Sequence, residues 1–242
     1  MKDNIHIFEN PEQLAIGLAD HFRNMIVELS KTRKMIHIAI SGGSTPKLFF
    51  QRLAEHHRHL PWEKIHLFWV DERCVPVEDH ESNFGMTKKS LLDKIDIPKS
   101  NIHYIIGNAD PETEARRYSE DIRQSLFSHN NWPVFDWILL GLGEDGHTAS
   151  LFPGSPLLHH SDANAAVAIH PQTNQKRITL TLPLINHAKN IIFLVSGHSK
   201  ADIVGEIFRS TDRKKTIPAT YIAPESGRVE WFLDQDAAKR LS

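Results

Sequence analysis

Short apolar runs alternate with longer stretches of helical character along most of the chain. The runs have the length and β-branched content of buried strands, and they lie at Ile5–Phe8, Ile36–Ile40, Ile65–Val70, His103–Ile106, Phe135–Leu140, Asn190–Gly197 and Val229–Leu233. The spacing of apolar positions predicts helices over Pro11–Ser30, from Pro46 onward, and over Asn83–Lys94, Pro111–His129 and Ser199–Arg209. This alternation predicts a mostly parallel sheet with helices on both faces.

Two neighbouring strand patterns break the alternation. Ala165–His170 and Arg177–Pro183 follow each other without a helical segment between them, so they predict a small antiparallel addition to the sheet. No internal repeat, low-complexity tract or flexible linker divides the sequence. One α/β domain over residues 1–242 is therefore the simplest prediction.

The composition excludes several classes of protein. Of the 242 residues, 40% are hydrophobic and the net charge is −2, so nothing draws the whole chain to nucleic acid or to an anionic membrane. The basic run Arg213–Lys215 is interpreted as a solvated loop. Cys74 is the only cysteine, no apolar run reaches membrane-spanning length, and the first residues lack the apolar core of a signal peptide. These features predict a cytoplasmic protein.

The 16 histidines invite a metal site, but their spacing does not support one. The sequence has no HExxH motif and no Cys/His pairs at zinc-ligand spacing. The side chains of the adjacent pairs His56–His57 and His159–His160 would diverge in regular structure. We therefore predict no metal and interpret the histidines as scattered surface residues.

The stretch Ser41–Pro46, SGGSTP, joins a predicted strand to a predicted helix. Thr45 is the candidate N-cap, and Pro46 suits the first helical position. Backbone N–H groups of such a turn, with the positive end of the helix dipole, favour a bound phosphate. The alternative is a tight connection whose glycines only allow unusual backbone angles.

Three further segments lie where predicted strands end: DER at residues 71–73, GLGEDGH at 141–147 and SGHSK at 196–200. In open α/β sheets ligands bind beyond the carboxyl ends of the strands, which favours the phosphate interpretation. The carboxylate of Asp145 could orient His147 as a general base; the alternative is a histidine held only by loop hydrogen bonds. The loop also matches GxGxxG, but no helix follows it, so NAD binding is not predicted.

Cationic side chains accompany these segments. Arg73 suits two-pronged binding of a phosphate or carboxylate, with a local ion pair to a neighbouring glutamate as the alternative. Arg177 and Lys200 are further candidates, although either one alone could be an ordinary surface charge. Cys74, beside Arg73, is interpreted as a packed residue rather than a nucleophile.

Together these motifs resemble the motif series of the 6-phosphogluconolactonases. SGGSTP, WVDERCVP with ESNFG, GLGEDGHTASLFPGS, RITLTLP and SGHSKA occur in that family's order between Ser41 and Ala201. The resemblance implies a Rossmann-like three-layer α/β/α sandwich, as in amino-sugar-phosphate deaminases, ribose-5-phosphate isomerases and CoA transferases. It also implies hydrolysis of a small sugar phosphate lactone, 6-phosphoglucono-1,5-lactone, in the pentose phosphate pathway, with no metal or organic cofactor.

The residue chemistry agrees with that activity. His147 would take a proton from water and later assist departure of the ring oxygen, with Asp145 orienting it. The 6-phosphate would be held by the turn residues Ser41, Gly42, Gly43, Ser44 and Thr45 and by the cations Arg177 and Lys200. Arg73 would face the sugar or the developing negative charge, and Asp71 would hydrogen-bond sugar hydroxyls.

Two alternatives stay open. Glucosamine-6-phosphate deaminases share the fold, the phosphate turn, an Asp-Glu pair and a DGH loop, but they typically carry a glutamate where this chain has Phe152 and a tyrosine in place of Arg73. A non-catalytic sugar-phosphate sensor on the same scaffold is the second alternative; the presence of both His147 and Asp145 argues against it. The expected oligomeric state is a monomer, with a dimer as the alternative.

Overall fold

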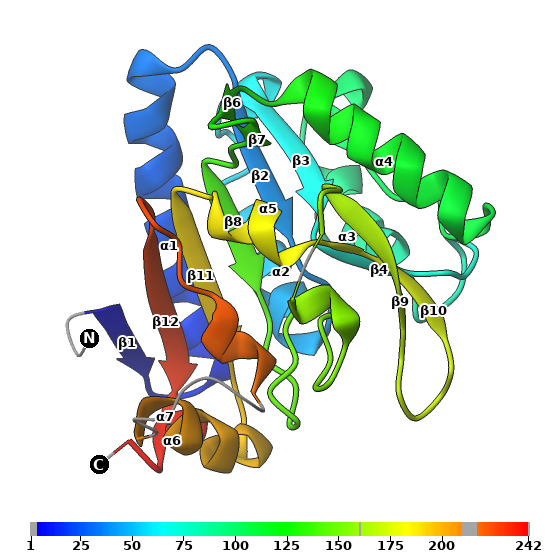
Figure 1. Ribbon diagram of the computed structural model, residues 1–242. Helices are drawn as coiled ribbons and strands as arrows, with labels where there is room; N and C mark the ends of the chain where they lie inside the picture. The colour runs from blue at the N-terminus through cyan, green and yellow to red at the C-terminus, as the bar shows by residue number, and fades with distance from the viewer. Residues whose placement is uncertain (1–3, 160, 210–216, 242) are drawn as a thin grey trace.

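A parallel sheet forms the centre of the computed structural model, which describes residues 4–159, 161–209 and 217–241. Within these ranges the sheet has seven strands, and every neighbouring pair is parallel. In spatial order the strands are β1 (Ile5–Phe8), β12 (Arg228–Asp234), β11 (Asn190–Val195), β8 (Trp137–Leu140), β2 (Ile36–Ile40), β3 (Ile65–Trp69) and β5 (Ile102–His103). The carboxyl ends of these strands lie at the bottom of Figure 1.

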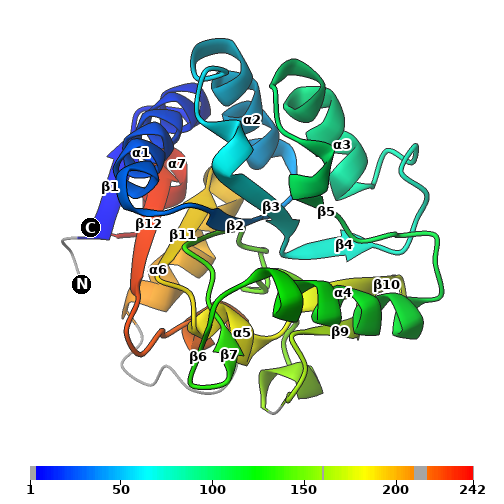
Figure 2. The same cartoon turned by 90° about the horizontal axis from the view of Figure 1, so that it is seen from above.

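Helices cover both faces of this sheet (Figure 2). One face carries α1 (Pro11–Thr32), α2 (Ser44–His56) and α3 (Asn83–Ser90). The other carries α4 (Pro111–Ser125), α5 (Leu182–Asn186) and α6 (Ala201–Arg209), while the short helix α7 (Gln235–Ala238) follows β12. The predicted three-layer α/β/α sandwich is confirmed.

The two long helices begin as local sequence chemistry predicts. The Asn10 side chain accepts a hydrogen bond from the Gln13 N–H and caps α1, and Asp110 caps α4 through the Thr113 N–H. A proline occupies the first turn of each helix, where a missing N–H costs nothing. The inner face of α1 buries six side chains, and each large one contributes roughly 2 kcal/mol; they are Leu14, Ala15, Leu18, Ala19, Phe22 and Ile26.

A second, antiparallel sheet stands beside the carboxyl end of the large one, at the right of Figure 1. Its strands are β4 (Asp71–Arg73), β10 (Lys176–Leu180) and β9 (Ala165–Ile169), in that order. The predicted antiparallel addition is therefore confirmed, and its third strand comes from the DER segment. The register places Arg177 directly opposite Arg73.

Several predicted boundaries are wrong. The helix expected to reach His129 ends at Ser125, and a hairpin of β6 (Ser128–His129) and β7 (Trp132–Pro133) follows. Asn130 and Asn131 form its turn at φ of 51° and 67°, a conformation that asparagine tolerates and that an amphipathic pattern does not reveal.

Two other elements are shorter than predicted. The helix expected over Asn83–Lys94 ends at Ser90, and a 3₁₀ turn, Leu92–Lys94, completes the segment. The strand expected over His103–Ile106 is only Ile102–His103, at the edge of the sheet where pairing is available on one side alone.

Some residues interpreted from the sequence lie outside the described ranges, namely Arg213–Lys215 and His160. Among the helices that are described, none combines the length and the apolar character needed to cross a membrane. A single domain over residues 1–242 stays a prediction.

Candidate active site

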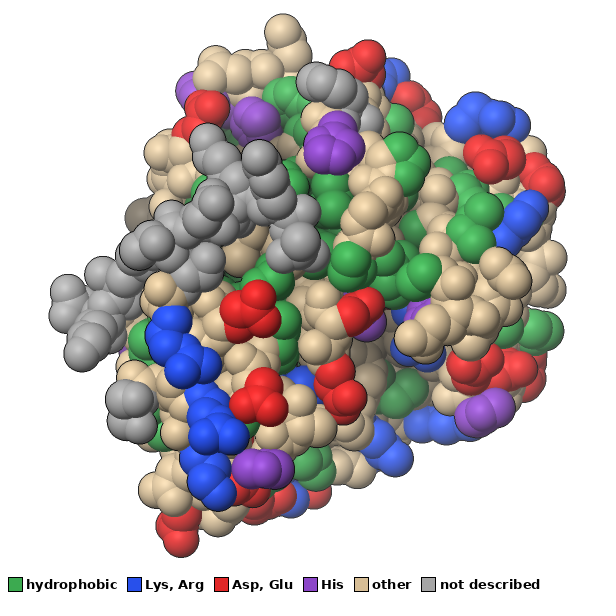
Figure 3. Space-filling view, turned by 60° about the horizontal axis from the view of Figure 1, so that its bottom comes forward, with side chains coloured by type: hydrophobic (Ala, Val, Ile, Leu, Met, Phe, Trp, Pro, Cys, Tyr) green, Lys and Arg blue, Asp and Glu red, His purple; other side chains and the backbone are tan. Residues whose placement is uncertain are grey.

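The four segments singled out at strand ends meet around one cavity of about 280 Å³. It is lined by Ser41, Gly42, Gly43, Asp71, Arg73, Asn83, Gly141, Leu142, Gly143, His147, Ala149, Arg177 and Lys200. The cavity opens at the carboxyl end of the large sheet, the place that open α/β sheets offer to ligands. Figure 3 brings this end of the molecule forward, with basic, acidic and histidine side chains gathered among hydrophobic ones.

The glycine turn after β2 forms one wall of the cavity. A Cβ atom at Gly42 would overlap the Asn83 amide, and Gly43 has φ of +112°, so neither position suits a larger residue. The helix α2 begins immediately afterwards, at Ser44. The turn residues Gly42 and Gly43 therefore line the cavity just before the positive end of the helix dipole, an arrangement that favours an anion.

The turn differs from its prediction in two respects. Gly43 occupies the N-cap position, and the Thr45 hydroxyl forms a hydrogen bond of 2.8 Å with the Ser196 hydroxyl, so the prediction of Thr45 as N-cap is wrong. The unusual φ of Gly43 starts the helix two residues earlier than the capping rule implied. Ser44 and Thr45 also lie outside the lining of the cavity, whereas Ser41 lines it.

The loop after β8 fixes the imidazole of His147. Its Nδ1 atom lies 2.6 Å from Oδ1 of Asp145, and its backbone N–H donates to the same oxygen at 3.1 Å. Gly146 adopts φ of +78° to make this turn, and a Cβ at Gly143 would overlap the imidazole. With Nδ1–H donated to the carboxylate, Nε2 is the basic nitrogen of the ring.

The carboxylate of Asp145 is kept ionised by this arrangement. Burial alone would raise the pKa of Asp145, but the hydrogen bonds and charge of His147 outweigh it, and the pKa is lowered from its usual value. An ionised partner stabilises the imidazolium that forms when His147 accepts a proton. Asp145 does not line the cavity, so it reaches a ligand only through His147.

Phe152 supports the same imidazole from the side. Its ring is buried, and its centroid lies 4.9 Å from that of His147 and 5.0 Å from that of His170. The guanidinium carbon of Arg177 lies 5.7 Å from the centre of the Phe152 ring. An apolar ring therefore contacts His147 at the position where deaminases typically carry a glutamate.

The carboxylates of the DER segment point in different directions, as alternation along a strand requires. Asp71 lines the cavity and accepts a hydrogen bond from the Ser150 hydroxyl at 2.7 Å and a longer one from the Asn83 amide at 3.4 Å. Glu72 is turned to α3 and accepts from the backbone N–H groups of Asn83 and Phe84. Only Asp71 is therefore available to a ligand.

Three cationic side chains reach the cavity: Arg73, Arg177 and Lys200. Arg73 donates through Nη1 to the Glu81 carbonyl at 2.6 Å, and within the described residues its guanidinium forms no ion pair with Glu72 or Glu78. Lys200 ends a 3₁₀ turn that starts after Gly197, whose N–H donates to the Asp234 carboxylate at 3.0 Å. Burial lowers the pKa of Arg177, yet a guanidinium stays charged at neutral pH.

Sequence reasoning missed two residues of the site. Asn83 and Ser150 both contact Asp71, from 12 and 79 positions away along the chain. Asn83 belongs to the ESNFG motif, which could have marked it, whereas no local pattern distinguishes Ser150. Cys74 is half-buried, and burial raises the pKa of its thiol, which agrees with a packed rather than nucleophilic role.

Among residues 4–159, 161–209 and 217–241, no group of three or more His, Cys, Asp or Glu side chains is placed to hold a metal ion. The cavity itself offers one carboxylate, one imidazole and three cations. Such a donor set suits an anion better than a metal.

The chain matches a known family that shares this fold. The family model of glucosamine-6-phosphate isomerases and 6-phosphogluconolactonases matches residues 9–231. That range includes all four segments around the cavity.

Individual relatives refine the class. The chain is 44% identical to a 6-phosphogluconolactonase of Haemophilus influenzae, over 92% of this chain and 94% of that one, and 45% identical to one of Synechocystis, over 84% of each. A solved 6-phosphogluconolactonase of Trypanosoma brucei superimposes with a TM-score of 0.88 at 30% identity, covering 99% of this chain and 98% of that one. The chain belongs to the glucosamine-6-phosphate isomerase/6-phosphogluconolactonase family, on its 6-phosphogluconolactonase side.

Proposed function

We propose that this protein hydrolyses 6-phospho-D-glucono-1,5-lactone to 6-phospho-D-gluconate, a step of the oxidative pentose phosphate pathway. The names of its relatives and the motif series support this activity. The observation that carries it in this chain is the hydrogen-bonded pair of Asp145 and His147, set at a cavity that also holds three cationic side chains. A phosphorylated lactone needs both a base and an anion site.

In the proposed reaction His147 acts twice. Its Nε2 atom takes a proton from a water molecule as the water oxygen bonds to the lactone carbonyl carbon, giving a tetrahedral oxyanion. When the carbonyl re-forms, the bond from that carbon to the ring oxygen breaks, and the imidazolium returns the proton to the departing oxygen. Asp145 stabilises the imidazolium between the two steps.

The remaining residues bind and orient the substrate in this proposal. The 6-phosphate is held by Arg177, Lys200 and the backbone N–H groups of the turn formed by residues 41–45. Arg73 faces the sugar or the developing oxyanion, where a fixed positive charge stabilises the transition state. Asp71 accepts hydrogen bonds from sugar hydroxyls.

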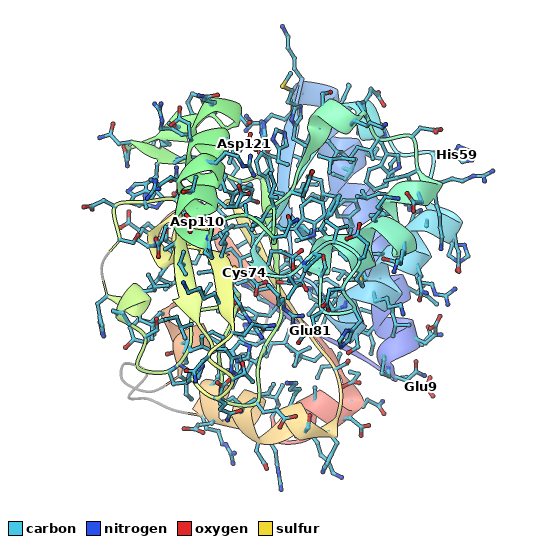
Figure 4. The ribbon with its side chains drawn as sticks, turned by 90° about the vertical axis from the view of Figure 1, so that its right-hand side faces the viewer. Glu9, His59, Cys74, Glu81, Asp110 and Asp121 are labelled. Atoms are coloured by element: carbon cyan, nitrogen blue, oxygen red, sulfur yellow. The ribbon has the colours of Figure 1, made fainter. Side chains whose placement is uncertain are left out.

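The test is the rate of lactone hydrolysis above the spontaneous background. Freshly generated 6-phosphogluconolactone is followed with a coupled 6-phosphogluconate dehydrogenase, in the presence of a chelator. We expect acceleration by the wild type, loss of that acceleration in His147→Ala, and wild-type rates in the matched control His59→Ala, which changes an exposed histidine far from the site (Figure 4). Near-normal turnover in His147→Ala would remove the general-base role.

The Phe152 contact and the same assay distinguish the two alternative functions from the lactonase. Deamination of glucosamine 6-phosphate is disfavoured because an apolar ring, Phe152, packs on His147 in place of a carboxylate. Tight 6-phosphogluconate binding without any acceleration would favour a sensor. A monomeric state and a cytoplasmic location accompany the proposal, and gel filtration with light scattering tests the first.

A further inference from the structure

Two of the cavity's cations stand closer together than their charges favour. Arg73 on β4 and Arg177 on β10 are directly opposite in the antiparallel register, where like charges destabilise a pair of strands. A cation pair of this kind suits a doubly charged anion such as a phosphate monoester. Something must nevertheless keep the two guanidinium groups in place before the anion arrives.

A chain of hydrogen bonds provides this support. Arg73 donates through Nη1 to the Glu81 carbonyl at 2.6 Å. The Glu81 carboxylate accepts from the Gln175 amide nitrogen at 2.9 Å, and the Gln175 amide oxygen accepts from Nε of Arg177 at 3.2 Å. Figure 4 labels Glu81, which lies on the segment between β4 and α3, so Gln175 connects that segment to β10.

A glutamine at position 175 suits these two partners better than a glutamate or an alanine would. An amide supplies one acceptor and one donor group, so a glutamine serves a guanidinium and a carboxylate at once. A glutamate would face the Glu81 carboxylate and neutralise part of the charge of Arg177, and an alanine would leave both partners unsupported. The neutral amide therefore orients Arg177 without reducing its attraction for an anion.

Arg177 is held on a second side by Phe152, whose ring lies beneath the guanidinium carbon. Gln175 thus engages Nε at the edge of the group and Phe152 its face. Within the described residues, the Nη atoms of Arg177 form no hydrogen bond to another side chain. They are the atoms left for a ligand.

We propose that Gln175 is a positioning residue for anion binding, which holds the guanidinium of Arg177 toward the phosphate of the substrate. The inference rests on the proposed function insofar as the substrate carries that phosphate. It assigns to Gln175 an effect on substrate affinity and none on the chemical step, because Gln175 contacts neither His147 nor Asp145.

The experiment compares Gln175→Ala and Gln175→Glu with Gln172→Ala, a change to an exposed glutamine of the same hairpin whose side chain forms no hydrogen bond within the described residues. Lactone hydrolysis yields KM and kcat, and calorimetry measures the Kd of 6-phosphogluconate directly. We expect KM and Kd to rise about tenfold in Gln175→Ala, the lower end of the effect of one lost hydrogen bond to a charged group. Gln175→Glu should raise KM and Kd further, and Gln172→Ala should change neither. We expect kcat to stay at the wild-type value in all three variants.

Two outcomes overturn the proposal. An unchanged KM and Kd in both Gln175 variants shows that Arg177 needs no such support. A fall in kcat at constant KM shows that position 175 acts on chemistry or on the fold instead. If the wild type does not hydrolyse the lactone, the proposed function fails, and the Kd comparison still decides the role of Gln175.

Discussion

The Nδ1 atom of His147 lies 2.6 Å from Oδ1 of Asp145, two residues earlier in the same loop. This contact fixes the tautomer in which Nε2 is free to accept a proton. Replacing Asp145 by asparagine keeps the shape but removes the charge that stabilises the imidazolium. We expect Asp145→Asn to lower kcat about 100-fold with little change in KM, measured by initial rates of lactone hydrolysis. Turnover close to that of the wild type would mean that His147 needs no carboxylate.

Gly143 is predicted to be indispensable because the imidazole occupies the space that a side chain would need. A Cβ at this position overlaps the His147 ring and comes within 2.6 Å of the Asp145 carboxylate. We expect Gly143→Ala to displace the ring and to lower kcat about 100-fold, since a small misplacement of a catalytic group has an effect of this size. Circular dichroism should show an intact fold; an unaltered kcat would contradict the packing argument.

Phe152 should matter to both stability and affinity. Its ring is buried and packs against His147 and the guanidinium of Arg177. We expect Phe152→Leu to lower the free energy of unfolding by about 1–3 kcal/mol and to raise KM. Phe127→Leu is the matched control, because Phe127 is 74% exposed and its replacement should leave both quantities unchanged. Equal effects of the two substitutions in urea titrations and kinetics would contradict this assignment.

A partly buried row of histidines, with His37 buried and His66 and His103 half-buried, crosses the large sheet at the opposite end from the cavity. The rings of His37 on β2 and His66 on β3 lie 5.2 Å apart, and His66 Nδ1 lies 3.0 Å from His103 Nε2 on β5. His103 in turn lies 2.9 Å from Asp121 of α4, a residue labelled in Figure 4, and Asp136 lies 4.0 Å from His37. The interpretation of all histidines as scattered surface residues is therefore wrong for this row.

This row predicts how stability depends on pH. Burial, reinforced by the charge of His66, lowers the pKa of His37 from 6.5 to about 4. The unfolded chain therefore binds the proton at a higher pH than the folded one, so stability falls as pH drops from about 6.5 to about 4. The loss from His37 reaches at most about 3 kcal/mol.

Urea unfolding between pH 7 and pH 4 measures this dependence. We expect His37→Leu to flatten the decline, because the substitution removes the titrating ring and keeps the backbone hydrogen bond from His37 to Asp136. His59→Leu, at an exposed position, should leave the decline unchanged. An identical slope in wild type and His37→Leu would show that other groups carry the effect.

Much of the fold could be predicted because its signals are local. Apolar runs marked the strands, and Asn10-Pro11 marked the start of α1. The position of the cavity followed from a general rule about strand ends. The Asn130–Asn131 turn and the cap at Gly43 were missed because competing local patterns, a helical period and a capping threonine, pointed elsewhere.

The contacts that complete the site lay beyond such reasoning. Gln175 reaches Glu81 over 94 positions because β4 and β10 pair in one register, and Ser150 reaches Asp71 beside Thr179, the β10 residue opposite Asp71 in that register. A sequence shows the residue types but not this register. The catalytic and binding roles assigned to the cavity residues stay predictions until the variants are measured.

The antiparallel sheet has a consequence for protein engineering. The proposed base stands on a loop of the large sheet, whereas Arg73 and Arg177 stand on β4 and β10, which form a separate platform. Grafting the β9–β10 hairpin of a relative onto this chain would exchange Gln175 and Arg177 and keep the sequence of the loop around His147, with Ser150 and Phe152 as the points where the two parts must still fit. Substrate preference can thus be redesigned without replacing the residues proposed for the chemistry.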